Sequence, residues 1–159
     1  MGKTLEETIA ARRLEETYSV SRLDGERLID VWPAICHELD RIPQHWADRW
    51  TKQSMLDGAM TGRFQVWAVG PPHEFNFVVI TQVASFPVCD ILQVVLGFGH
   101  NMLQGLPVLV ATLQKFATVQ GCARWEVEGR QGWERVLSDY GFKRDRVVLS
   151  GLVPNMRMN

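Results

Sequence analysis

The last third of the chain, residues 88–151, constrains the fold most strongly, because strand-like apolar runs alternate there with helix-like stretches. The run VCDILQVVLG predicts a strand, and a helix is expected to begin near Leu106-Pro107 and to end at Gly121. CARWEVEG then predicts a strand, GWERVLSDYGF a helix closed by Gly141, and KRDRVVLSGLV a final strand. A β-α-β-α-β succession of this size favours helices layered on a central sheet.

The upstream half is expected to complete this sheet. TYSVSRL alternates as a short first strand does, and Asp24 is placed to cap a helix. Pro43 is expected to open a second helix that contains Trp46 and Trp50. The apolar stripe of the first helix recurs at helical spacing and consists of Leu28, Val31, Trp32, Ile35 and Leu39.

Three further strands follow as an antiparallel meander. Gly58 and Gly62 are expected to break the second helix, after which RFQVWAVG and FNFVVITQVASF predict a hairpin and VCDILQVVLG its third strand. The consecutive apolar residues Val78, Val79 and Ile80 indicate burial on both faces, at the centre of the sheet.

Composition excludes several classes of protein. With 159 residues, 46% of them apolar and 22% charged, the chain is ordinary for a soluble globular domain. A net charge of −1 provides no strong field toward nucleic acid or an anionic membrane. The three cysteines lack the spacing of a zinc site or a disulfide framework, which fits a reducing compartment. No apolar run reaches membrane-spanning length, so no membrane partner is expected.

Residues 1–16 are predicted to form a separate N-terminal helical arm, because their apolar stripe is thin, with only Leu5 and Ile9. The arm is expected either to be solvated or to become ordered on a neighbouring subunit. Residues 17–159 are then expected to form one domain.

The order of elements over about residues 17–153 resembles the GNAT N-acetyltransferase superfamily. The most specific piece is GCARWEVEGRQGWERVLSDYGF, in which a strand leads into a short helix that ends in the pair Gly141-Phe142. The segment from Gly129 to Trp133 is also similar to small GNAT-like proteins of tailed phages. The resemblance implies an α+β fold, whose mixed central sheet joins an antiparallel meander to the βαβαβ half and is flanked by helices.

The resemblance also implies where acetyl-CoA would bind. In this family its pyrophosphate binds backbone N–H groups at a helix N-terminus, where unsatisfied amides and the helix dipole attract phosphate. The corresponding residues here are Gly97, Gly99, His100, Gln104 and Gly105. The family's loop pattern is not kept, because Gln104 and Gly105 are adjacent, and Pro107 is expected to remove one N–H donor.

A second functional position also departs from the pattern of this family. The family often places a tyrosine four residues before the glycine of its Gly-Phe pair, as the acid that protonates the leaving thiolate. That position is Leu137 in this chain. Tyr140 lies directly before Gly141, on the stripe with Trp133, and is expected to pack.

Glu126 and Glu128 are the candidate catalytic residues. They alternate with apolar residues along the predicted strand, so both side chains lie on one face and could accept a proton from an amine. The alternative is a solvated strand face, paired with Arg124 or Arg130. His100 is a further candidate base, or an exposed loop residue.

Several functional interpretations remain open. The first is a GNAT-like protein with a degenerate acetyl-CoA loop, a non-catalytic component of a phage particle that acts through contacts with other protein subunits, including copies of itself. The second is an acetyl-CoA-dependent N-acetyltransferase with a divergent loop, located in the cytoplasm. A third is a binding module that uses the same cleft. No metal-ligand cluster, P-loop or nucleic-acid-binding patch is found, so neither a metal nor a specific nucleic acid is expected.

Overall fold

The computed structural model describes residues 2, 4–9, 18–42, 49–72 and 74–154. The chain divides into two compact units, Met1–Glu128 and Gly129–Asn159. The first unit contains the sheet and the helices that cover it, and the second contains a short helix and the C-terminal segment.

The sheet of the first unit has five strands in the order in which they occur in the sequence. The first three pairings are antiparallel and the last, between β4 and β5, is parallel. The predicted mixed sheet is therefore confirmed, as is the burial of Val78, Val79 and Ile80 at its centre. The strands are β1 (Ser19–Leu23), β2 (Phe64–Gly70), β3 (Phe77–Ser85), β4 (Asp90–Gly99) and β5 (Arg124–Val127).

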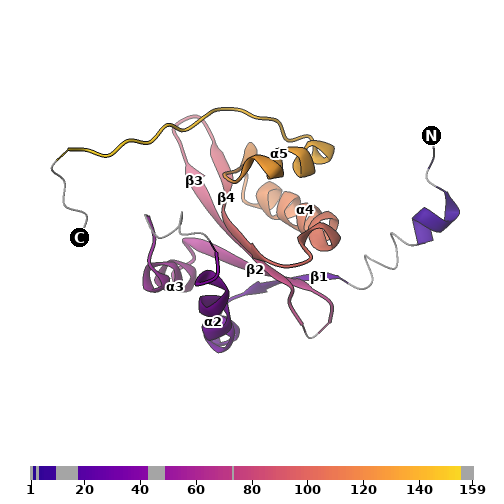
Figure 1. Cartoon of the computed structure of the whole chain (residues 1–159), viewed down its shortest axis with the longest axis horizontal. Helices are drawn as coiled ribbons and strands as arrows, with labels where there is room; N and C mark the ends of the chain where they lie inside the picture. The colour runs from indigo at the N-terminus through magenta and orange to yellow at the C-terminus, as the bar shows by residue number, and fades with distance from the viewer. Residues whose placement is uncertain (1, 3, 10–17, 43–48, 73, 155–159) are drawn as a thin grey trace. The chain divides into compact units, whose positions relative to one another are not determined.

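Helices α2 (Gly25–Leu39) and α3 (Lys52–Met60) lie on one face of the sheet, and α4 (Met102–Val119) lies on the other (Figure 1). The α2 stripe packs against the core as its spacing predicts, with Leu28, Trp32, Ile35 and Leu39 buried. Asp24 is the residue before α2, but its side chain makes no capping hydrogen bond.

The predicted second helix is tested only in part. Its start at Pro43 and its residue Trp46 lie outside the described residues, whereas Trp50, predicted to be inside the helix, precedes α3. The helix begins after Thr51, whose side chain accepts a hydrogen bond from the Ser54 amide in a reciprocal capping box. Gly58 lies inside the helix instead of ending it. A Cβ there would collide with the Phe64 ring, so the glycine allows α3 to pack closely against β2.

The predicted start of the next helix is also wrong. Helix α4 begins at Met102, four residues before Leu106, and carries Pro107 in its interior. Packing of its first turn explains the difference: a Cβ on Gly105 would lie 2.7 Å from both Phe77 Cε1 and Val69 Cγ1. The absence of a Cβ lets the helix approach the sheet this closely, which outweighs the local glycine and proline signals.

By length and composition alone, α4 is apolar enough to cross a membrane. Six of its residues are buried, and it contacts β1, β2 and β4. Apolar residues on most sides of a helix are equally typical of a helix packed on a sheet in a protein core.

The second unit contains α5 (Gln131–Leu137), which continues as a 3-10 turn over Ser138–Tyr140 and ends at Gly141 in the left-handed conformation, as predicted. The expected final strand, KRDRVVLSGLV, is wrong: the described residues 143–153 belong to no sheet. Val147, Val148 and Leu149 are exposed and consecutive, so they do not alternate between a buried and a solvated face. Strand propensity without such a face does not specify pairing.

At the N-terminus, residues 5–9 are helical. Thr4 and Glu7 cap this helix reciprocally, with hydrogen bonds of 2.8 and 3.2 Å. Leu5 and Ile9 are exposed. Residues 10–16 of the predicted arm lie outside the described part of the chain, and the boundary between an arm and residues 17–159 stays a prediction.

Candidate functional site

Strand β4 changes its neighbours halfway along its length. Its parallel pairing with β5 runs from Ile91–Arg124 to Val94–Val127. On its other side the pairing with β3 is irregular at the same place, because Thr81 pairs with Val94 while Ile80 pairs with Leu96. Val95 is therefore a bulged residue. Beyond it, among the described strands, β4 pairs only with β3 and leaves one edge open.

The backbone of Gly97 faces this open edge. The His100 amide donates to the Asn76 carbonyl at 2.9 Å, in the same register that pairs Gly99 with Phe77. In an antiparallel ladder, every second residue directs its N–H and C=O groups to the partner strand. Phe98 therefore bonds to β3, and Gly97 points its N–H and C=O groups toward the side that β5 leaves free. Such an edge can bind an extended ligand that carries amide groups.

Helix α4 starts three residues after Gly99. Asn101 precedes it in the left-handed conformation, with φ 54°, and its side chain does not cap the helix. The first-turn amides are consequently not occupied by an N-cap side chain, and an anion can bind there. Pro107 is the sixth helical residue, beyond these amides, so the expectation that it removes a phosphate donor is wrong.

A polar network holds the first turn of α4 in place. The Tyr18 hydroxyl donates to Gln104 Oε1 at 2.6 Å, and the Asn76 side-chain amide donates to the Tyr18 hydroxyl oxygen at 3.0 Å. Tyr18 and Asn76 are both buried. The network joins α4 to the residues that precede β1 and β3. Its two hydrogen bonds connect residues that are 58 and 86 positions apart in the sequence. No local pattern could reveal it.

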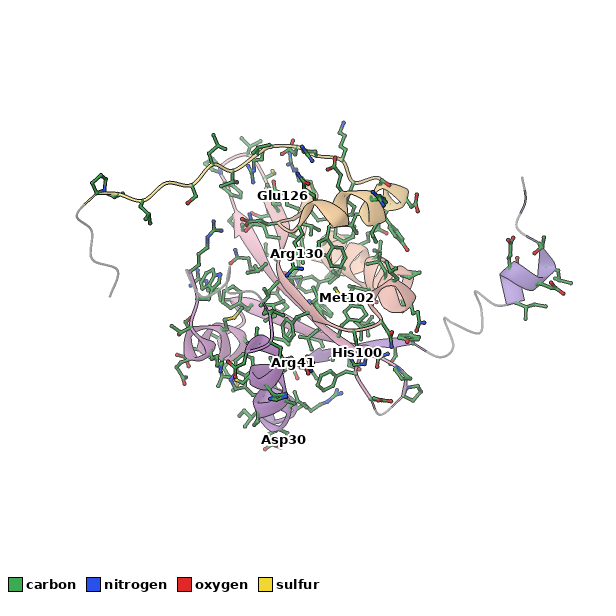
Figure 2. The ribbon with its side chains drawn as sticks, viewed as in Figure 1. Asp30, Arg41, His100, Met102, Glu126 and Arg130 are labelled. Carbon is green, nitrogen blue, oxygen red and sulfur yellow. The ribbon has the colours of Figure 1, made fainter. Side chains whose placement is uncertain are left out.

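The five residues predicted to contact a cofactor all lie at the β4–α4 junction, but they differ in role. Gly99 and Gly105 are required by packing. A Cβ on Gly99 would collide with Asn76 and Phe77, and a Cβ on Gly105 would collide with Phe77. Gln104 is engaged by Tyr18. Gly97 and the exposed His100 have no such constraint, apart from the backbone bond of His100. Figure 2 shows His100 and Met102 at this junction; the Met102 methyl lies 3.5 Å from the Cβ position of Gly97.

Glu126 lies toward the other end of the site. It pairs with Gln93 of β4, which lies seven residues before His100. The rise of a strand therefore places Glu126 and His100 roughly 20 Å apart. Its carboxylate accepts hydrogen bonds from Arg124 at 2.9 Å and from Gln93 at 3.4 Å. Gln93 is in turn bonded to Gln82, so a polar row crosses three strands.

Glu128 is more exposed, with 67% of its side chain accessible, and it forms an ion pair with Arg49 at 3.4 Å. Pairing with an arginine was the alternative interpretation of both glutamates; it is found for Glu126, with the predicted Arg124, and for Glu128, with a different partner. By pairing register Glu126 lies two residues before the bulge and Glu128 lies level with it; Glu126 is the less exposed of the two, with 18% of its side chain accessible.

Leu137 is buried, and Tyr140 is partly buried. Burial, and to a smaller degree the Asp139 carboxylate, raises the pKa of Tyr140. Among the described residues, no group of three or more His, Cys, Asp or Glu side chains could hold a metal ion.

No protein-family model matches this chain, and no curated protein matches its sequence. Its fold, in contrast, matches solved structures over most of their length. A probable acetyltransferase superposes with a TM-score of 0.66 at 8% identity, covering 88% of this chain and 99% of that one. An aminoglycoside acetyltransferase from an uncultured soil metagenomic sample, in complex with sisomicin, gives 0.61 at 12% identity, with coverages of 88% and 99%.

Glucosamine-6-phosphate N-acetyltransferase from Arabidopsis thaliana gives a TM-score of 0.62 at 8% identity and covers 86% of this chain and 98% of its own. Identities this low show the fold and nothing finer. The five-stranded mixed sheet with helices on both faces thus agrees with the expected α+β architecture. The chain has the fold of the GNAT acetyltransferases.

Proposed function

We propose that this chain binds acetyl-CoA along the free edge of β4 and at the N-terminus of α4, and that it transfers the acetyl group to an amine. The observation that carries the proposal is the coincidence of the Val95 bulge, the end of the β5 pairing and the uncapped first turn of α4. Of the two departures of this loop from the family pattern, the proline at Pro107 lies outside that first turn, and the adjacency of Gln104 and Gly105 remains.

The residues fit the parts of this ligand. The amides of Met102 and Leu103 are first-turn groups suited to pyrophosphate, and the backbone of Gly97 suits the amide groups of the pantetheine arm. Acetyl-CoA supplies an activated acetyl thioester. Glu126 would accept the amine proton, and the open strand edge would hold the thioester in place, since positioning alone supplies much of the rate in acyl transfer.

The first test is isothermal titration calorimetry of the full chain with acetyl-CoA, with desulfo-CoA and buffer as controls. Saturable binding in the micromolar range is expected. Leu103 provides a directed variant, because it is 66% exposed and lies in the first turn of α4. Leu103→Glu should weaken acetyl-CoA binding by about tenfold or more, because its carboxylate repels the pyrophosphate.

Leu103→Gln is the matched neutral control and should bind like the parent chain. A carboxylate in the first turn interacts favourably with the helix dipole and stabilises the helix. The loss of acetyl-CoA affinity in Leu103→Glu therefore cannot be attributed to unfolding of α4. Equal affinity of the two variants, or no heat at millimolar acetyl-CoA from a folded sample, would contradict the proposal.

A second prediction separates the two glutamates. Glu126→Gln should lower the rate of acetyl transfer by about 10²–10⁴-fold with little change in acetyl-CoA affinity, because a neutral amide cannot accept the amine proton. Glu128→Gln, at the more exposed site, should keep most of the rate. Steady-state kinetics against a panel of amines measures both. If Glu126→Gln retains full turnover, the carboxylate belongs only to the polar row with Gln93 and Gln82.

The alternative function, a non-catalytic phage assembly component, is favoured by one observation. Five apolar residues of the C-terminal segment are exposed, and such clusters often bind another protein. These residues are Val147, Val148, Leu149, Leu152 and Val153. This function places the chain in a phage particle, whereas the enzymatic function places it in the cytoplasm. A folded chain that fails to bind acetyl-CoA but forms oligomers through residues 147–153 would support it.

A further inference from the structure

Cys89 and Cys122 lie side by side at the N-terminal ends of β4 and β5. The parallel register pairs Ile91 with Arg124, and the Ala123 amide extends it by donating to the Asp90 carbonyl at 2.9 Å. Counting back two positions on each strand places Cys89 opposite Cys122. Both cysteines are free and partly exposed.

The geometry of neighbouring strands suits a disulfide. Adjacent strands are about 4.8 Å apart, which falls within the roughly 4.4–6.8 Å between Cα atoms that a disulfide spans. Residues opposite each other in a parallel pair also direct their side chains to the same face of the sheet. Each cysteine stands just before its strand: the carbonyl of Cys89 accepts the Phe86 amide and closes a turn, and Cys122 follows the left-handed Gly121.

The environment of Cys122 supports this placement. Burial raises the pKa of its thiol most, and the Asp90 carboxylate and the Cys89 thiol raise it further. The two sulfur atoms are therefore near enough to interact electrostatically. The raised pKa also keeps Cys122 mostly protonated at neutral pH, so it is not a highly reactive lone thiol.

We propose that Cys89 and Cys122 form a reversible disulfide in the presence of a low-molecular-weight disulfide such as oxidised glutathione. The thiolate of one cysteine attacks a glutathione sulfur, forms a mixed disulfide and releases one glutathione thiolate. The thiolate of the other cysteine attacks the protein-bound sulfur and releases the second glutathione. Two electrons pass from the cysteines to the glutathione disulfide, and the two thiol protons end on the two reduced glutathione molecules.

The bond would join β4 to β5 at the end opposite the open edge and would close a loop containing β4 and α4. Closing this loop restricts the unfolded chain and stabilises the folded one. The inference concerns the redox state of the sheet and does not depend on acetyl-CoA binding.

The test treats the folded full chain with oxidised glutathione and measures intact mass, thiol content after denaturation and a non-reduced peptide map. We expect the loss of two hydrogens, a fall from three free thiols to one, and a peptide linking Cys89 to Cys122. The melting temperature should rise by roughly 5–10 °C and return on reduction. Disulfide formation should be faster at pH 8.5 than at pH 7 because more thiolate is present.

Cys36→Ser is the matched control, because Cys36 lies in α2. This variant should form the same bond and show the same rise in melting temperature, with both of its remaining thiols lost. Cys89→Ser and Cys122→Ser should instead accumulate a glutathione adduct and show no such rise in melting temperature. Adducts without an internal bond in the parent chain, or a bond that includes Cys36, would overturn the proposal.

Discussion

Gly99→Ala is expected to lower the free energy of unfolding by about 3–5 kcal/mol. Gly99 has φ 127°, a conformation that residues with a side chain rarely adopt. A Cβ there would also collide with the Asn76 carbonyl oxygen and lie 2.5 Å from Phe77 Cα. These are backbone atoms of a paired segment, so they cannot turn aside as a flexible side chain could. Urea-induced unfolding, followed by circular dichroism, measures the change.

Gly97→Ala is the matched control on the same strand. A Cβ there would lie 3.5 Å from Met102 Cε and 3.8 Å from Val79 Cγ2, which is ordinary van der Waals contact. The free energy of unfolding should therefore change by less than about 1 kcal/mol. Comparable losses for the two variants would show that β4 does not approach the residues before β3 as closely as the structure has it.

Thr81→Val is expected to cost about 2–4 kcal/mol of folding free energy, although the two side chains have nearly the same shape. The Thr81 hydroxyl accepts the Trp67 indole N–H at 2.9 Å and donates to Gln65 Oε1 at 2.9 Å. All three side chains are buried. Replacing the hydroxyl by a methyl group leaves the indole N–H and the amide oxygen without these partners in a place that water cannot easily reach.

Thr81→Ser keeps the hydroxyl and should recover most of the lost stability, whereas a purely steric role of Thr81 would favour valine. A double-mutant cycle with Trp67→Phe adds a second measurement. Because Trp67→Phe removes one of the unpaired groups, the combined cost of the two substitutions should be smaller than the sum of their separate costs. Additive costs would contradict the hydrogen-bonded network.

Residues with a strong local period were predicted correctly from the sequence. The buried stripe from Leu28 to Leu39 follows the helical repeat, and Val78 to Ile80 occupy the sheet centre. Gly121 and Gly141 both have the left-handed conformation expected after a helix. The mixed sheet followed from the order of these elements, since a hairpin specifies antiparallel neighbours and a helical crossover specifies parallel ones.

The errors arose where tertiary contacts override local signals. Gly105 and Pro107 predicted a later start for α4, but the contact of Gly105 with Phe77 and Val69 stabilises an earlier one. The network of Tyr18, Asn76 and Gln104 and the proximity of Cys89 to Cys122 depend on strand register, which no single strand encodes. Of the candidate site, the sequence could thus predict the loop but not which of its residues are occupied by structural contacts.

Because of the bulge at Val95, the number of residues between Val94 and Gly97 matters more than which residues they are. Val94 pairs with Thr81 and Gly97 pairs with Val79, so these two β4 residues share a face although they are three positions apart. Substitutions between them leave the bulge intact, whereas the loss of one residue would remove it: Gly97 would still pair with Val79 in a regular ladder, but the local bend and the extra twist that the bulge gives β4 would be lost. Divergence of this protein should consequently retain the length of the segment between Val94 and Gly97 while its side chains change freely.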